Sequence, residues 1–249
     1  MLQQTVLYLL LFLLALSSAA FSTPLLDSDG KIIRTDTSFT RIISFYGAHT
    51  RNLIDMGAEK QIVAIGRSDK QLPALPTLSF RDDPERLLAL KPDLVLIRPM
   101  LRRAYPKMVE RLELSGVAVV SIQPTSVDEM FRYWKVLGIL SGHQVNAEEM
   151  ITHFKNKLDA LAHQVNKIPV QKRKRVYFES IHKRMKTFAP DSMAIFVLKS
   201  AGGINIAADA IQVRQTNIAA YSKERILDKA DQIDVFLAQQ GRMNQQHQT

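Results

Sequence analysis

Two distant stretches of the sequence place the same chemistry-bearing residues at the same spacing. DPERLLALKPDLVLI and SKERILDKADQIDVFLA each hold a Glu-Arg pair, two aliphatic residues, a polar link with an Asp, and an aliphatic run. If Asp83 and Ser222 cap two helices, Glu85 and Glu224 both fall at the second helical position, where the helix dipole favours a carboxylate by about 0.3–1 kcal/mol. The residues alone leave two interpretations open: helix-stabilising charges, or acidic side chains that bind two basic sites on a partner.

Two histidines that follow predicted strands are the other candidates for chemistry. His49 comes after RIISFY and His182 after RVYFESI, and open α/β sheets bind ligands at the carboxyl ends of their strands. Each is either a ligand contact or an ordinary polar loop residue, and their positions do not favour a shared metal ion. The sequence has no G-x-S-x-G, P-loop, G-x-G-x-x-G or H-E-x-x-H motif, so no catalytic residue is predicted.

Composition indicates a folded and basic protein. The 249 residues are 46% hydrophobic, which is enough for a sizeable core, and the net charge is +9. Cysteine is absent, which excludes disulfides, thiolate metal sites, cysteine nucleophiles and a lipid anchor on an N-terminal cysteine. Nucleic-acid binding is not expected, because the basic run QKRKR directly precedes the strand VYFES and is typical of a solvated loop. Attraction to anionic headgroups or an anionic ligand stays open.

The first 22 residues, MLQQTVLYLLLFLLALSSAAFS, are predicted to be a secretory signal. They contain no charged side chain, and an apolar run is followed by small residues suited to cleavage near Ala20 or Ser22. The apolar run is shorter than the roughly 20 residues that a bilayer span needs. The alternative is an uncleaved membrane anchor, because no Lys or Arg precedes the run.

The chain after this segment alternates between aliphatic runs and helical patterns. LLDSDGKIIR predicts a small hairpin that turns at Asp29-Gly30. Four buried strands are expected at 41–46, 61–66, 93–97 and 117–122, with helices between them. Continuous aliphatic strands that alternate with helices predict a parallel sheet covered on both faces.

A long helix then interrupts this alternation. Ser126 and Glu129 form a capping box for one helix, and Asn146 and Glu149 form a second for the next. In the second helix, apolar residues are spaced 3, 4, 3, 4, which predicts a rod of about 30 Å extending to Lys167. Such a rod could be a core helix or could connect two domains.

Strands resume at 175–181 and 233–239, so a second α/β unit is expected. The predicted organisation is a signal peptide at 1–22, an N-terminal lobe at 23–125, linking helices at 126–168 and a C-terminal lobe at 169–249. The fold class is α/β, with a mostly parallel sheet in each lobe and one long backbone helix joining the lobes.

The order of these segments resembles a known family. RIISFYGAHTRNLIDMGAEKQIVAIGRSD, DPERLLALKPDLVLIRP, WKVLGILSGHQVNAEEMITHFKNKLDAL, SAGGINIA and YSKERILDKADQIDVFLAQQG are similar to substrate-binding proteins of ABC importers for ferric siderophores, haem and cobalamin. The resemblance covers about residues 40–244. It implies two lobes bridged by a rigid helix, a ligand in the cleft between them, and a Glu on each lobe that binds Arg residues of the membrane permease. By motif match these are Glu85 in PERLLAL and Glu224 in KERIL.

The resemblance also implies a site, a location and a mode of action. We expect a monomer in the periplasm, without lipid anchor, catalytic residue, cofactor or bound metal, that captures an iron complex or corrinoid. Aromatic side chains would stack on the ligand and Arg side chains would meet its oxygen atoms. The expected ligand contacts are Tyr46, His49, Arg67, Arg98 and Met100 in the first lobe and Glu179, His182, Lys186, Phe188 and Gln239 in the second.

One departure from the family and two rival functions stay open. Family members usually continue past the strand matched by DVFLAQQG, whereas this sequence ends at GRMNQQHQT. Two alternatives follow: the second lobe lacks part of its sheet, or the sequence is that of a truncated gene product. One rival is a zinc- or manganese-binding protein of a related importer cluster, which would need three or four converging His, Asp or Glu side chains. The other is an enzyme on a similar two-lobed scaffold.

Overall fold

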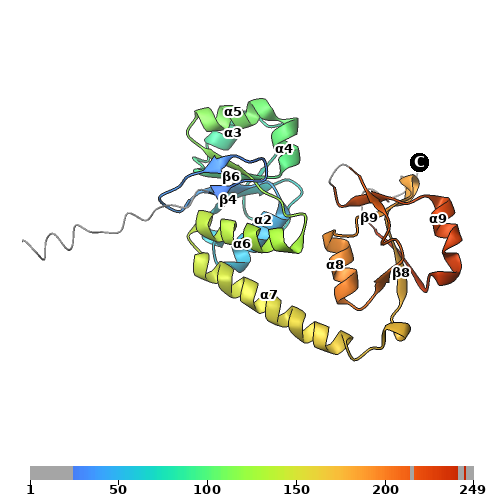
Figure 1. Cartoon of the computed structure of the whole chain (residues 1–249). Coiled ribbons are helices and arrows are strands. Elements are labelled where there is room, and N and C mark those ends of the chain that lie inside the picture. Colours follow the sequence, from blue (N-terminus) through green and yellow to red (C-terminus); the bar gives the residue numbers. More distant parts are fainter. Residues whose placement is uncertain (1–24, 214–215, 241–243, 245–249) are drawn as a thin grey trace, which may run out of the picture.

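The computed structural model describes residues 25–213, 216–240 and 244, and it has two α/β lobes connected by one long helix (Figure 1). The predicted signal segment at 1–22 lies outside the described residues. Among the helices that are described, none is long and apolar enough to cross a membrane.

The N-terminal lobe contains a five-stranded sheet in the order β5-β4-β3-β6-β7, and every strand pair is parallel. The parallel sheet predicted from the aliphatic runs is therefore confirmed. Its strands are β3 (Ile42–Ser44), β4 (Ile62–Gly66), β5 (Thr77–Leu78), β6 (Leu94–Ile97) and β7 (Ala118–Ser121). The helices between them are α2 (Gly47–Asp55), η1 (Glu59–Gln61), α3 (Pro84–Leu88), α4 (Pro99–Ala104) and α5 (Pro106–Leu114).

The side chains of successive residues in these strands pack into two separate hydrophobic cores, one on each face of the sheet. Ile42 and Leu94 pack into a cluster with α2 and α6 (Val127–Ser141), whereas Ile43 and Val95 pack into a cluster with α3 and α5. All four residues are completely buried. The period-two alternation of a strand explains this division, and burial on both faces explains why the strands are aliphatic throughout.

The predicted hairpin is confirmed as β1 (Leu25–Leu26) paired antiparallel with β2 (Ile32–Ile33), and Gly30 adopts φ +80° in its turn. The Asp27 carboxylate is buried at the base of this turn. It accepts hydrogen bonds from the backbone N–H groups of Asp29 and Lys31, both at 2.9 Å, and pairs with the Arg102 guanidinium at 3.1 Å. Arg102 also contacts Asp29 and Glu113, so one cation from α4 holds the hairpin on the lobe.

Removing the Asp27 carboxylate is expected to destabilise the protein. Asp27→Ala removes the acceptor of three backbone N–H groups, those of Asp29, Lys31 and Ser121, and part of the counter-charge of Arg102. This should lower the free energy of unfolding by about 2–4 kcal/mol. Urea unfolding measures this difference. Asp36→Ala, at an exposed position of the neighbouring loop, is the control and should change stability by less than about 0.5 kcal/mol. Equal losses in both variants would contradict the role of the buried pair.

The long helix is α7 (Gln144–Val165), and it runs from one lobe to the other (Figure 1). At 22 residues it is about 33 Å long. Ala147 and Ile151 pack into the N-terminal core together with α6, while Val165 at the far end packs against Gly202 of the other lobe. Most residues of its second half are exposed. Of the two interpretations that the sequence left open, the structure therefore shows the connecting rod.

The start of α7 corrects one prediction. The Ser126 side chain does accept the Glu129 N–H at the start of α6, but Asn146 and Glu149 do not form a capping box, because both lie inside α7. The reason is the short turn between the helices. Gly142 ends α6 in the left-handed conformation (φ +75°), and the His143 N–H donates to the Gly138 carbonyl, so the chain enters α7 two residues earlier than the predicted cap.

The C-terminal lobe contains a six-stranded sheet that is mixed rather than mostly parallel. β8 is parallel to β10 and β13, but the β8–β9, β9–β12 and β11–β12 pairs are antiparallel. A tight turn after β8, with Met185 at φ +48°, returns the chain directly beside that strand and requires antiparallel pairing. The elements are η2 (Val170–Lys172), β8 (Arg175–Ile181), η3 (His182–Arg184), β9 (Lys186–Phe188), α8 (Met193–Ser200), β10 (Ile204–Asn205), β11 (Ile211–Gln212), β12 (Ile218–Ala220), α9 (Lys223–Asp228), η4 (Ala230–Gln232) and β13 (Val235–Ala238).

The duplicated sequence motif performs the same structural task in both lobes. α3 leads into β6 and α9 leads into β13, and an Asp precedes each strand. Asp93 accepts the Arg41 N–H at 2.8 Å, and Asp234 accepts the Arg175 N–H at 2.7 Å. Each carboxylate thereby fixes the start of the neighbouring parallel strand. The basic run QKRKR lies at the entry to β8, where the Arg173 guanidinium donates to carbonyl groups at the end of α7.

Candidate ligand-binding site

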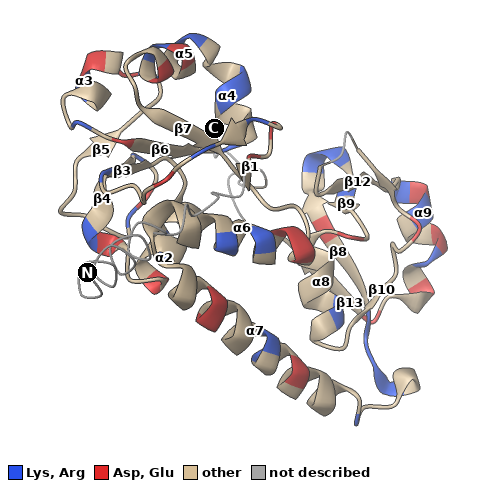
Figure 2. Cartoon of the chain, turned by 60° about the vertical axis from the view of Figure 1, so that its left-hand side comes forward, with Lys and Arg blue, Asp and Glu red and all other residues tan. Residues whose placement is uncertain are grey.

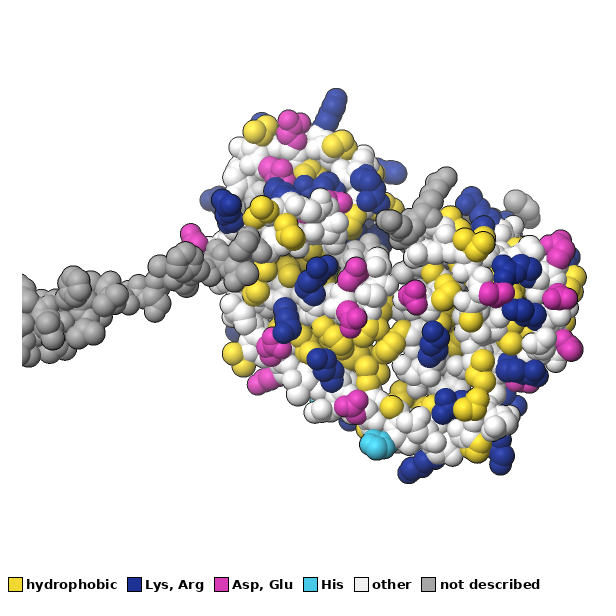
Figure 3. All heavy atoms as spheres, viewed as in Figure 1, with side chains coloured by type: hydrophobic (Ala, Val, Ile, Leu, Met, Phe, Trp, Pro, Cys, Tyr) yellow, Lys and Arg dark blue, Asp and Glu magenta, His cyan; other side chains and the backbone are white. Residues whose placement is uncertain are grey.

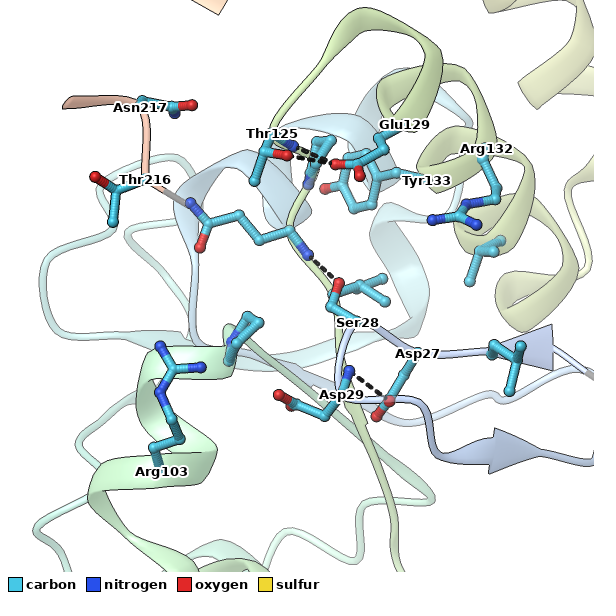
Figure 4. A pocket seen from close by; sticks show the side chains of 16 residues that line it. Asp27, Ser28, Asp29, Arg103, Thr125, Glu129, Arg132, Tyr133, Thr216 and Asn217 are labelled. Atoms are coloured by element: carbon cyan, nitrogen blue, oxygen red, sulfur yellow. Dashed lines mark hydrogen bonds between the residues drawn. The ribbon is translucent and has the colours of Figure 1, made fainter. Parts of the chain in front are cut away.

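A cavity of about 750 Å³ lies between the two lobes. Figure 3 shows the lobes as two masses that meet along a groove, and Figure 4 shows the cavity with residues from both of them. The N-terminal lobe contributes the β1–β2 hairpin, α4, the chain after β7 and α6, and the C-terminal lobe contributes the residues before β12. The lining residues are Leu26, Asp27, Ser28, Asp29, Pro99, Arg103, Ile122, Gln123, Pro124, Thr125, Glu129, Arg132, Tyr133, Val136, Thr216 and Asn217.

Two exposed guanidinium groups lie on different elements of the cavity wall. Figure 2 shows Lys and Arg positions on both of these helices, α4 and α6. Arg103 lies on α4 and Arg132 on α6, and neither forms an ion pair with another described residue. The carboxylates beside them are already engaged. Glu129 accepts hydrogen bonds from the hydroxyl and N–H of Thr125, both at 2.7 Å, and these bonds lower its pKa. The cavity therefore offers two guanidinium groups that pair with no carboxylate among the described residues.

One residue of the cavity wall, Tyr133, belongs to a buried chain of hydrogen bonds. The His49 Nε2–H donates to the Ile97 carbonyl at 3.3 Å, which leaves Nδ1 to accept the Tyr133 hydroxyl at 2.8 Å. The Asn52 amide donates in turn to the Tyr133 oxygen at 3.1 Å. Burial lowers the pKa of His49 to about 4, with a further contribution from the nearby Arg98 charge, and burial also raises the pKa of Tyr133. His49 is therefore neutral and completely buried.

The predicted ligand residues of the first lobe do not belong to the wall of this cavity. His49 has no exposed surface, and it hydrogen-bonds the Tyr133 hydroxyl inside the core. The Arg98 guanidinium stacks on the Tyr46 ring at 4.4 Å. Arg67 pairs with Asp82 at 2.7 Å, and the exposed Met100 lies on α4. None of the five is among the described residues that line the cavity.

The predicted residues of the second lobe gather at the carboxyl end of β8. The buried Glu179 carboxylate accepts a hydrogen bond from His182 Nδ1 at 2.9 Å, and the imidazole itself is exposed. Lys186 begins the antiparallel strand β9, and Phe188 packs on Phe178 with ring centroids 4.7 Å apart. The Gln239 N–H donates to the Glu179 carbonyl. These residues form one cluster, but none of them lines the described cavity.

The sequence reasoning missed the wall made by the chain after β7, the hairpin and α6. Gln123 and Pro124 follow the fourth predicted strand, so the strand-end criterion used for the other strands would have found them. Thr216 and Asn217 carry no local signal, because they reach the cavity only through the placement of the second lobe.

Glu85 and Glu224, the acidic residues of the duplicated motif, lie on the surface at equivalent positions. Glu85 is the second residue of α3 and Glu224 the second residue of α9, each after a capping side chain, Asp83 or Ser222. Glu85 contacts Arg111 of α5 at 3.1 Å, with both side chains more than half exposed. A hydrogen bond from its own backbone N–H, and a second from the Ser222 hydroxyl, lower the pKa of Glu224. Within the described residues, no group of three or more His, Asp or Glu side chains is placed to hold a metal ion.

The fold and this site define a solute-binding protein with two lobes. The model of a family described as periplasmic binding protein matches residues 42–248, and the chain belongs to this family. Its members are binding proteins rather than enzymes, in agreement with the prediction that no residue is catalytic.

Three proteins illustrate the similarity. A curated relative, the uncharacterized ABC transporter substrate-binding lipoprotein YvrC of Bacillus subtilis, is 21% identical over 144 residues, which are 56% of this chain and 46% of the relative. The chain thus spans about half the length of that relative. One solved structure is that of a possible iron-binding (periplasmic solute-binding) protein of Staphylococcus epidermidis. It has a TM-score of 0.71 at 23% sequence identity, and the match covers 83% of this chain and 79% of the other. The haem-binding protein HutB of Vibrio cholerae has a TM-score of 0.67 at 23% identity, covering 80% and 76%.

Proposed function

We propose that this is a periplasmic protein that captures its ligand in the cavity between its lobes and delivers it to an ABC-type permease. The ligand is an iron complex, such as a ferric siderophore or haem, or a corrinoid. The observation that carries this proposal is the cavity of about 750 Å³ with walls from both lobes. Its volume suits a ligand of several hundred daltons, and small-molecule sites are commonly concave, partly apolar and placed between domains. Proteins of similar structure include a haem-binding protein, a vitamin B12-binding protein and one named as a possible iron-binding protein, which supports this ligand class.

The lining is more polar than apolar, and it favours a ligand that carries anionic groups beside a smaller apolar surface. Ile122, Pro124 and Val136 provide apolar surface, and the Tyr133 ring adds an aromatic wall. The Arg103 and Arg132 guanidinium groups could each meet a carboxylate or catecholate oxygen, since Arg presents a planar fork of donors. Haem and many ferric siderophores carry such oxygens, whereas a bare metal ion would not use this wall.

Titration of the purified protein with haem, ferric siderophores of different charge and cobalamin, followed by ligand absorbance, tests the proposal. We expect saturable binding of one class without product formation. The double variant Arg103→Glu/Arg132→Glu should weaken binding of an anionic ligand by at least about tenfold, because two favourable charges become repulsive.

A charge-matched control separates this effect from general electrostatics. Lys157→Glu/Lys167→Glu also reverses two exposed positive charges, neither of which is part of the cavity wall, and it should leave the dissociation constant within about twofold. Absence of binding to every compound would contradict the proposed function. Unchanged affinity in the double variant would remove the two Arg residues from the site.

A further inference from the structure

The β1–β2 hairpin belongs to the cavity wall through Leu26 and the turn that follows it, although the hairpin is very short. Its two strands contain two residues each, and a lone two-stranded hairpin is at best marginally stable in water. Leu25 and Ile33 pack against the core of the N-terminal lobe, whereas Leu26 and Ile32 are exposed. The position of the turn therefore depends on its polar contacts as well as on this packing.

The Arg102 guanidinium of α4 makes several of these polar contacts. Its Nη2 donates to the Asp27 carboxylate at 3.1 Å and to the Val119 carbonyl of β7 at 2.9 Å. Its Nε lies 3.3 Å from the Asp29 carboxylate. The Arg102 side chain is only 20% exposed, so water competes little for these partners. One side chain therefore connects the hairpin, α4 and β7.

The turn of the hairpin is also bonded to the chain that leaves β7. The Ser28 N–H donates to the Ser121 carbonyl at 2.8 Å, and the Gln123 N–H donates to the Ser28 hydroxyl at 3.1 Å. The Ser121 N–H donates to the Asp27 carboxylate at 3.3 Å. Ser28 and Gln123 both line the cavity (Figure 4). A displacement of the turn would therefore alter two neighbouring parts of the wall together.

The anchored helix also carries one of the two guanidinium groups of the cavity. α4 has six residues, and Arg103 directly follows Arg102 in it. Because successive residues of a helix point about 100° apart, Arg102 can bind the hairpin while Arg103 lies on the cavity wall. The bonds from Arg102 to Asp27 and Val119 thus restrain the backbone that positions Arg103.

We propose that Arg102 is a positioning residue of the ligand site. It is not among the described residues that line the cavity, but it holds the hairpin turn, the chain after β7 and Arg103 in the arrangement that receives the ligand. This inference rests on the proposed function, because it takes the cavity as the ligand site. Without Arg102, the ligand must order part of its own wall on binding, and that cost lowers its affinity.

Arg102→Met keeps an unbranched apolar side chain and removes the guanidinium. In hydrogen exchange, the amides of Ser28, Lys31 and Gln123 should exchange at least about tenfold faster, while those of the central strand β6 stay unchanged. Haem and a ferric tris-catecholate are the two ligand probes, and the dissociation constant of a probe that binds the wild type should rise at least about tenfold. Arg102→Lys retains the charge without the fork of donors, so it should restore part of the affinity.

Arg41→Met is the matched control. The Arg41 guanidinium donates to the carbonyls of Leu90 and Lys91, so its removal also takes away contacts within the N-terminal lobe, but Arg41 is not part of the cavity wall. Circular dichroism verifies that each variant is folded at the assay temperature, where a residue that only stabilises the fold leaves the dissociation constant unchanged. Arg41→Met should therefore keep both the affinity and the exchange of the hairpin amides within about twofold.

The two readouts separate this inference from the proposed function. If the wild type binds neither probe, the proposed function is contradicted, and the exchange rates alone decide whether Arg102 holds the wall. Unchanged exchange of the Ser28 and Gln123 amides in Arg102→Met would overturn the inference. Faster exchange with unchanged affinity, or equal losses of affinity in Arg102→Met and Arg41→Met, would overturn it as well.

Discussion

Reversing the charge of both Glu85 and Glu224 is expected to abolish ligand transport while leaving ligand affinity within about twofold. Both side chains are exposed at the second position of short helices on different lobes, and neither lines the cavity. In the proposed function, each pairs with an Arg of the permease. Replacing a carboxylate by Lys at such a contact costs about 2–5 kcal/mol, so two reversals should reduce productive docking by at least roughly a thousandfold.

Transport assays in reconstituted vesicles, run beside ligand titration, provide the measurement for Glu85→Lys/Glu224→Lys. The matched control is Glu110→Lys/Asp228→Lys, which reverses one exposed acidic charge on each lobe at a different helical position. It should retain most of the transport activity. If the first variant instead lost ligand affinity, and transport per bound ligand stayed the same, the docking role of the two Glu residues would be wrong.

Protonation of His49 is expected to make the protein less stable in mild acid. Its pKa is about 4 in the folded state, below the ordinary value of about 6.5, because the ring is completely buried. Between these two values only the unfolded chain binds the proton. Stability is therefore fully present above about pH 6.5, falls as the pH drops towards 4, and has declined by about 2 kcal/mol at pH 5.

Urea unfolding of wild type and His49→Gln at pH 7.5, 6.0 and 5.0 isolates this contribution. The Gln variant is expected to be less stable at pH 7.5, since it replaces a ring bonded to both Tyr133 and Ile97. It should, however, lose about 2 kcal/mol less than the wild type between pH 7.5 and 5.0. Parallel pH profiles for the two proteins would show that His49 is not the titrating group.

The buried state of His49 also illustrates where sequence reasoning reached its limit. Its position after β3 correctly placed it at the carboxyl end of a parallel strand. The direction of its side chain depends on α6, which brings Tyr133 to within hydrogen-bond distance from 84 residues away in the chain. A local pattern cannot report a partner that distant, so an inward and an outward histidine give the same signal.

The cavity wall likewise contains residues that a local pattern could predict and residues that only distant contacts place there. The end of β7 could have been found by extending the strand-end rule to Gln123, but the hairpin reaches the cavity because Arg102 of α4 binds Asp27 and Asp29. Similarly, the aliphatic run of β13 predicted a strand correctly, although the same kind of run is central in β6 and lies at an edge in β13.

The sequence by itself determined the α/β class, the parallel sheet of the first lobe, the Asp83 and Ser222 caps and the long helix, because periodicity and capping act over a few residues. The tertiary structure decided which side chains line the cavity and that His49 is buried. These features depend on contacts between residues far apart in the chain, and their geometry exists only after the lobes have packed.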